Sequence, residues 1–188
     1  TAFFVSDAHL GIEPPGLEPR QKHLREFLEN TITGDDTLFI VGDLFDFWIE
    51  YRRFIRADLF DILCTLRTLA VQGTELHYVA GNHDFALESF LSDHLGMQVH
   101  MHNHVAGIQG CRVHVQHGDG VLASDYGYRF LRAVLRNRFN RRLYKLLHPS
   151  FAVWLAGRVS RSSRLLSGDS ITEAVLAKYR AVAAGVLD

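Results

Sequence analysis

Short apolar runs alternate with longer amphipathic stretches along the first two thirds of the chain. The runs that predict β-strands are Ala2–Ser6, Thr37–Val41, Glu75–Ala80, Met97–Val105 and Cys111–Gln116. The first three are apolar almost without interruption, as expected for strands buried on both faces of a sheet. Apolar positions recurring every three or four residues predict helices over Arg20–Thr31, Arg53–Val71 and Phe85–Leu95. Strands that alternate with helices indicate an α/β fold with a largely parallel sheet.

The last two predicted strands differ from the others because a short GIQG segment joins them. This spacing predicts an antiparallel hairpin. His100, His102 and His104 alternate along its first strand and so would share one face. A solvated face is the favoured interpretation, with metal binding as the alternative.

From Asp125 onward the pattern predicts helices only, which we interpret as a helical insertion over residues 125–166. Ten Lys or Arg and no Asp or Glu lie between Tyr126 and Gly168. One interpretation is a solvated basic face above an ordinary core stripe. The other is an amphipathic lid whose basic residues face phosphates or a membrane surface, with apolar residues meeting acyl chains. The apolar residues in question are Phe130, Leu135, Phe151, Trp154 and Leu155.

Composition limits the class of protein. With 188 residues, 47% of them hydrophobic and 22% charged, the chain is most simply one globular domain, residues 1–188. No apolar run is long enough to span a bilayer. Cys64 and Cys111 are too few for a disulfide framework, so we expect a reducing compartment, the cytoplasm, and two buried thiols.

Polar clusters follow four of the predicted strands at the point where each strand ends. They are Ser6–His9, Gly42–Asp46, Gly81–Asp84 and His117–Asp119. Because ligands of parallel α/β sheets bind at the carboxyl ends of the strands, these clusters are expected to converge on one site. Each cluster alone is equally compatible with a capped turn, but all four in this order favour a ligand site.

The side chains in these clusters suit hard or borderline divalent metals. Asp7 and His9 lie at i and i+2 of an extended segment, so both can hold one ion. Asp43 can bridge two ions, and Asn82 and His117 would complete a mixed nitrogen and oxygen set. Such a set favours Mn, Fe, Zn or Mg over soft metals.

The order DxH, GDxxD, GNHD and HGD resembles the calcineurin-like metallophosphoesterase superfamily. This resemblance implies a four-layer sandwich of two facing mixed sheets flanked by helices, with two divalent metal ions at the sheet edge. It implies that Asp7 and His9 hold the first ion, that Asp43 bridges both, and that Asn82 and His117 hold the second.

The same resemblance assigns catalytic roles within the GNHD segment. His83 would contact the phosphate and protonate the leaving oxygen, oriented by Asp84, with Asp46 as a supporting carboxylate behind the metal ligands. The ions, with manganese favoured, would activate a water molecule against phosphorus.

A finer match involves VGDLFDFWI, GNHDF and HGD followed by DYGY at 125–128. It resembles the family of UDP-2,3-diacylglucosamine pyrophosphohydrolases of the lipid A pathway, and implies hydrolysis of UDP-2,3-diacylglucosamine to lipid X and UMP. The insertion would cap the acyl chains. Substrate contacts are implied for Asp125, Ser160, Arg161 and Arg164. A cytoplasmic enzyme on the inner-membrane surface is expected, with nucleic acid not expected as a partner.

Two departures from these families keep alternatives open. His83 stands where the best-known pyrophosphohydrolases have Arg, and the last superfamily motif, GHxH, is absent from the chain. We expect that the domain lacks its C-terminal portion. The alternatives are a nuclease or phosphodiesterase of the same fold, whose basic stretch would bind nucleic-acid phosphates, and a non-catalytic scaffold.

Overall fold

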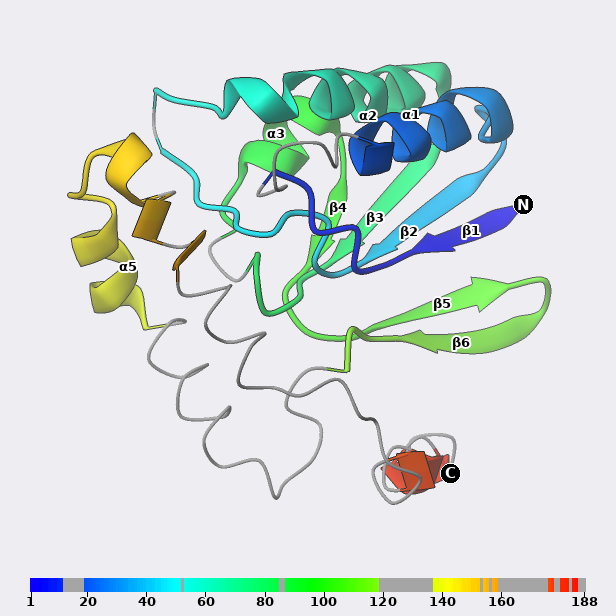
Figure 1. The fold of residues 1–188 in the computed structure, drawn as a ribbon. Helices are drawn as coiled ribbons and strands as arrows, with labels where there is room; N and C mark the ends of the chain where they lie inside the picture. The colour runs from blue at the N-terminus through cyan, green and yellow to red at the C-terminus, as the bar shows by residue number, and fades with distance from the viewer. Residues whose placement is uncertain are drawn as a thin grey trace.

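The computed structural model describes residues 1–11, 19–51, 53–84, 87–118 and 137–152, and further along the chain 154, 155, 157, 158, 176, 177, 180–182, 184 and 185. A four-stranded parallel sheet forms its centre (Figure 1). The strands lie in chain order and comprise β1 (Ala2–Val5), β2 (Thr37–Val41), β3 (Glu75–Val79) and β4 (Gln98–His100). The parallel pairing confirms the expected α/β class.

The connecting helices all cover one face of this sheet (Figure 1). They are α1 (Pro19–Thr31), the short 3₁₀ helix η1 (Ala57–Leu59) with α2 (Phe60–Gln72), and α3 (Phe90–Leu95). Right-handed crossovers between sequential parallel strands place every connection on the same side. Ile62 and Leu66 of α2 are fully buried with Tyr78 of β3 in the main core. Because the strands are parallel, their carboxyl ends share one edge of the sheet. The helices bury only one face of the sheet.

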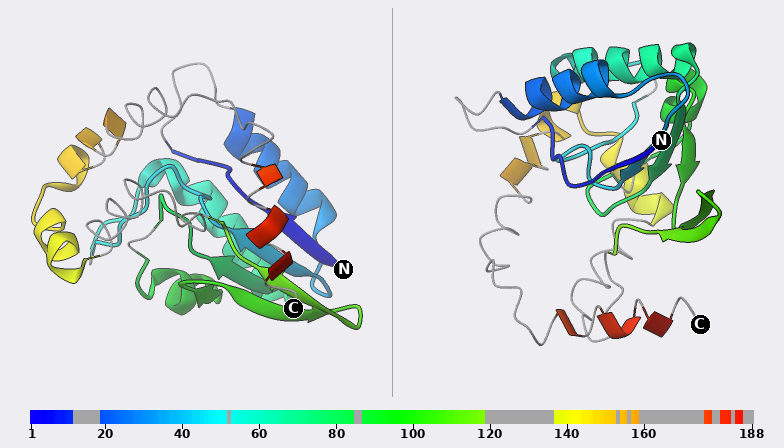
Figure 2. Two further views of the ribbon diagram at one scale, coloured as in Figure 1. Left: turned by 90° about the horizontal axis from the view of Figure 1, so that it is seen from below. Right: turned by 90° about the vertical axis from the view of Figure 1, so that its right-hand side faces the viewer.

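An antiparallel hairpin covers the opposite face, as Figures 1 and 2 show. It consists of β5 (His104–Ile108) and β6 (Cys111–Val115). Gln109 and Gly110 both have positive φ, 51° and 80°, which matches a two-residue turn of the kind that fits the twist of paired strands. A second buried cluster lies between hairpin and sheet and comprises Phe39, Val79 and Val115.

The prediction of one strand over Met97–Val105 was wrong. Gln98–His100 pairs in parallel with β3, whereas His104 onward pairs with β6. The chain leaves the first sheet after His100, whose main-chain oxygen accepts a 2.9 Å hydrogen bond from Ala80 N–H. The three exposed residues at 101–103 then turn the chain to the second sheet.

Two helices begin later than predicted. The helix expected from Arg53 starts at Phe60 after the 3₁₀ turn, because Arg56 is extended, with φ −68° and ψ 119°. The helix expected from Phe85 starts at Phe90. Both cysteines were expected to be buried, but Cys64 on α2 and Cys111 on β6 are exposed.

Helix α5 (Arg138–Tyr144) belongs to the predicted insertion and lies beside the loop that follows β2 (Figure 1). Tyr51 donates a 3.3 Å hydrogen bond to the main-chain oxygen of Leu147, and Lys145 lies 2.6 Å from Glu88.

Most of residues 125–166 lie outside the described residues, so the bounds of the insertion stay a prediction. The described layers are helices, parallel sheet and hairpin; the fourth layer also stays a prediction. Within the described residues, no helix has the length and apolar character required to cross a bilayer.

Candidate metal centre

The segments that follow β1 and β2 run alongside each other at the sheet edge. His9 N–H donates to the main-chain oxygen of Asp43 at 2.9 Å, and Asp7 N–H donates to that of Gly42 at 3.3 Å. Asp7, His9 and Asp43 have φ of 53°, 48° and 51°. Positive φ is uncommon outside glycine and concentrates at functional sites. The three residues that the sequence proposed as ligands thus share an unfavourable backbone conformation.

Asp43 lies at the centre of the cluster and is 2% exposed. Its Oδ1 accepts a 2.9 Å hydrogen bond from His83 N–H, and its Oδ2 lies 3.4 Å from His117 Nε2 and 3.9 Å from His83 Nε2. Burial opposes ionisation of Asp43. The hydrogen bonds from His117 and from the His83 backbone outweigh burial, so the pKa of Asp43 falls below its ordinary value. The carboxylate is therefore ionised and faces two imidazoles.

His117 and Asn82 lie together on one side of Asp43. His117 Nδ1 is 2.9 Å from the main-chain oxygen of Val41, which can only accept, so Nδ1 carries a proton and Nε2 points toward Asn82 Oδ1 at 3.2 Å. Burial opposes the charged imidazole, but the hydrogen bond and charge of Asp43 raise the pKa of His117 to about 9. A cation among these three side chains would take the place of the Nε2 proton.

His9 lies on the other side of the cluster, among Asp7, Asp46 and His83. Its Nε2 is 3.8 Å from Asp7 Oδ1, its Nδ1 is 3.3 Å from Asp46 Oδ1, and its ring meets that of His83 edge-on with centroids 4.9 Å apart. His9 Nδ1 is buried without a hydrogen bond from the described part of the chain. Buried polar atoms normally have partners, and the Asp46 carboxylate at 3.3 Å is the group that faces this nitrogen, which leaves Nε2 for a ligand.

The donors fit divalent cations. Asp7, His9 and Asp43 offer atoms within 4.8 Å of one another, as do His9, Asp46 and His83. Carboxylate oxygens and imidazole nitrogens form a set that suits Mn, Fe, Zn or Mg. The described residues thus bring together all five predicted ligands, Asp7, His9, Asp43, Asn82 and His117.

Two glycines allow the loops to approach this closely. A Cβ at Gly81 would lie 2.2 Å from Asp43 Oδ1, and one at Gly42 would lie 2.4 Å from His117 Nδ1. Gly42 also has φ of 75°, which favours glycine. Gly81 therefore leaves space for the Asp43 carboxylate, and Gly42 leaves space for the His117 ring.

Asp84 lies beneath the centre and is fully buried. It accepts hydrogen bonds from Asp43 N–H at 3.0 Å, from Gly81 N–H at 2.5 Å, and from the Tyr78 hydroxyl. Burial raises the pKa of Asp84 to about 6, although the hydrogen bond from Tyr78 opposes this. These contacts position the two strand-end loops.

The contacts described for Asp84 do not include the His83 ring, so its implied role in orienting that ring stays a prediction. His83 Nδ1 lies 2.6 Å from the main-chain oxygen of Asp46. Tyr78 was not predicted as a site residue, because in the sequence it resembles any other apolar position of a buried strand.

An open cavity of about 510 Å³ is lined mainly by the segment of the chain that follows Asp46. Its lining includes Phe47, Trp48, Tyr51, Phe54 and Phe90, with Glu50, Arg56 and Asp58 as charged members. Trp48 N–H donates to the main-chain oxygen of His83 at 3.3 Å, which joins the cavity wall to the centre. The candidate substrate residues Asp125, Ser160, Arg161 and Arg164 lie outside the described residues.

Three curated proteins that are similar to this chain carry the same name. A UDP-2,3-diacylglucosamine hydrolase of Porphyromonas gingivalis is 35% identical over 86% of this chain and 63% of its own length. The protein of that name from Nitrosococcus oceani is 35% identical with the same coverage, and that from Hamiltonella defensa is 29% identical over 90% of this chain and 63% of its own. The chain thus spans less than two thirds of these relatives.

A solved protein of unknown function from Aquifex aeolicus is 17% identical, with a TM-score of 0.46 over 71% of this chain and 72% of that one. The model of the family described as "Calcineurin-like phosphoesterase" matches residues 1–183 of this chain.

Proposed function

Because the chain belongs to the calcineurin-like phosphoesterase family, we propose that it is a dinuclear metal-dependent hydrolase that cleaves the phosphoanhydride of UDP-2,3-diacylglucosamine to lipid X and UMP. The observation that carries this proposal is the convergence of three strand-end loops on the buried Asp43 carboxylate. A pair of cations would account for so many polar side chains at one edge of the sheet.

Each ligand has a place in this proposal. Asp7 and His9 would hold one cation, Asn82 and His117 the other, and Asp43 would lie between them. Two bound cations, with manganese favoured, supply charge that activates water and neutralises the phosphate oxygens. Val41 fixes the His117 ring through its main-chain oxygen, so that Nε2 is presented to the cation.

His83 is proposed to act on the phosphate itself. The main-chain oxygen of Asp46 accepts from Nδ1 at 2.6 Å, which leaves Nε2 directed at the centre, 3.9 Å from Asp43 Oδ2. Protonated at Nε2, the ring can contact a phosphate oxygen and donate a proton to the leaving oxygen. General acid catalysis of this kind contributes about 10²–10⁴-fold in rate.

The apolar surroundings support a lipid substrate. The cavity that follows Asp46 in the chain includes five aromatic residues in its lining, Phe47, Trp48, Tyr51, Phe54 and Phe90. Large apolar side chains of α5, of the turn after it and of the helical residues that follow are exposed, namely Phe139, Leu143, Leu146, Phe151 and Trp154. Acyl chains or a membrane surface would cover such groups. We include in the proposal that Asp125, Ser160, Arg161 and Arg164 contact the sugar and diphosphate, and that the enzyme works in the cytoplasm at the inner-membrane surface.

A comparison of hydrolysis rates on three substrates tests this function. UMP release from UDP-2,3-diacylglucosamine with added Mn²⁺ should exceed hydrolysis of bis-p-nitrophenyl phosphate and of single-stranded DNA. Faster hydrolysis of DNA or of the small diester would assign a nuclease or a general phosphodiesterase instead. Absence of all three activities would support a scaffold.

A further inference from the structure

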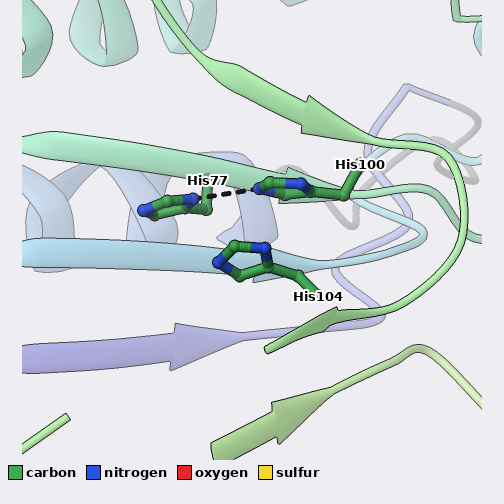
Figure 3. Close-up of side chains that lie close together, drawn as sticks. All are labelled: His77, His100 and His104. Carbon is green, nitrogen blue, oxygen red and sulfur yellow. Dashed lines mark hydrogen bonds between the residues drawn. The ribbon is translucent and has the colours of Figure 1, made fainter. Parts of the chain in front are cut away.

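Three histidines from three strands meet between the parallel sheet and the hairpin (Figure 3). His77 lies on β3, His100 ends β4 and His104 begins β5. His77 Nδ1 is 3.0 Å from His100 Nε2, and the rings of His100 and His104 stack with centroids 3.9 Å apart. Each residue offers a nitrogen within 4.8 Å of the others. This trio shares no residue with the cluster around Asp43.

A carboxylate orients His77. Its Nε2 lies 3.2 Å from Glu75 Oε1, two residues earlier on the same strand, and Gln98 donates to that oxygen at 3.0 Å. Because an ionised carboxylate only accepts, the proton of His77 resides on Nε2 and the lone pair of Nδ1 faces the other two rings. A carboxylate behind a histidine is the usual support for a metal-binding imidazole.

Metal-binding imidazoles are neutral. Burial lowers the pKa of His77 and that of His100, and His104 lowers both further, whereas Glu75 opposes the shift at His77. His77 is 5% exposed and stacks on Phe39 with centroids 4.6 Å apart. His100 and His104 are only partly buried, so an ion and a water molecule can approach from their side.

We propose that His77, His100 and His104 bind one divalent transition-metal ion, Zn²⁺, which fastens the β5–β6 hairpin to the parallel sheet. Two nitrogens bound tetrahedrally to zinc at about 2.0–2.1 Å lie about 3.3 Å apart, close to the 3.0 Å between His77 and His100. Three histidines with a fourth position open to water form a recognised zinc environment. His104 is the hairpin's ligand, and the other two belong to the sheet.

Zinc stoichiometry tests the proposal. After chelation and dialysis, the wild-type protein titrated with Zn²⁺ should bind one equivalent more than His104→Gln. His102→Gln is the matched control, because His102 lies in the same connection, is exposed and is outside the trio. Asp43→Asn should lose zinc from the phosphoesterase centre and keep the equivalent that depends on His104. The two sites can therefore fail separately.

Glu75→Gln provides a second test that leaves all three ligands in place. Loss of the supporting carboxylate should weaken binding of this equivalent about 10–100-fold. If His104→Gln does not fold, Glu75→Gln, at an exposed position, tests zinc binding by the trio in its place, together with the zinc content of Asp43→Asn. Equal zinc binding by the wild type, His104→Gln and Glu75→Gln would overturn the proposal and leave the trio as a packing contact.

Discussion

At the scale of single residues, the convergence of the five candidate ligands could be predicted because the carboxyl ends of parallel strands share one edge of the sheet. Asp7, His9, Asp43, Asn82 and His117 all lie in the same cluster. The role of Asp84 could not be predicted, because it depends on a hydroxyl six residues away that folds back onto it. Side-chain direction across a turn is a tertiary property.

His83→Ala should retain both metals and lose about 10²–10⁴-fold in UMP release, because the variant lacks the proposed proton donor to the leaving oxygen. Hydrolysis of bis-p-nitrophenyl phosphate should fall less, since p-nitrophenolate leaves without a proton. Asp43→Asn is the contrasting variant and should lose metal by elemental analysis. Equal loss on both substrates by His83→Ala would limit His83 to phosphate binding.

Asp84→Asn should lower the free energy of unfolding by about 1–3 kcal/mol. Both oxygens of Asp84 accept hydrogen bonds. In Asn, an NH₂ group would replace one of these oxygens and would face an N–H or O–H donor, so at least one hydrogen bond would be lost. Urea denaturation measures this effect. Tyr78→Phe should cost less, because it removes one donor and leaves the carboxylate bound to two backbone N–H groups.

At the scale of elements, the parallel strands could be predicted closely because their apolar runs are uninterrupted. The division of Met97–Val105 into two strands could not, since alternating polar residues look the same whichever sheet they join. The same ambiguity concealed the histidine trio. A continuous strand would place His100, His102 and His104 on one face, whereas the turn leaves His102 outside and brings in His77.

The trio predicts a pH-dependent stability in metal-free protein. Burial holds the pKa of His77 and His100 below the ordinary value of 6.5, so the unfolded chain binds protons more readily as pH falls through that value. The free energy of unfolding should therefore decrease from about pH 7 to about pH 5. His100→Gln should show a smaller decrease in urea denaturation with a chelator present. An equal or larger decrease would contradict this account.

At the scale of the whole molecule, the α/β class and a helix in the region of α5 could be anticipated from periodicity. The described residues form three layers: the helices, the parallel sheet and the hairpin. The way in which the hairpin covers the sheet depends on contacts between residues far apart in the chain, such as Phe39 and Val115. Long-range packing of this kind leaves no local trace in the chain.

Exposed apolar residues on the insertion predict membrane binding by the whole molecule. Phe139 and Leu146 are 71% and 81% exposed. Replacing both with Glu should weaken flotation with anionic vesicles at least about tenfold, because two apolar contacts are lost and the surface charge becomes repulsive. Val71→Glu is the control, since Val71 is 70% exposed but lies on α2. Equal loss in the control would indicate a charge effect only.

The positions of the two cysteines offer a means of observing hairpin docking. Cys64 lies on the helical layer and Cys111 on the hairpin, both accessible, and the chain contains no other thiol. A nitroxide attached to each would therefore report the separation of the outer layers without any added mutation. Adding zinc should narrow the distribution of that separation, provided that His104 is intact.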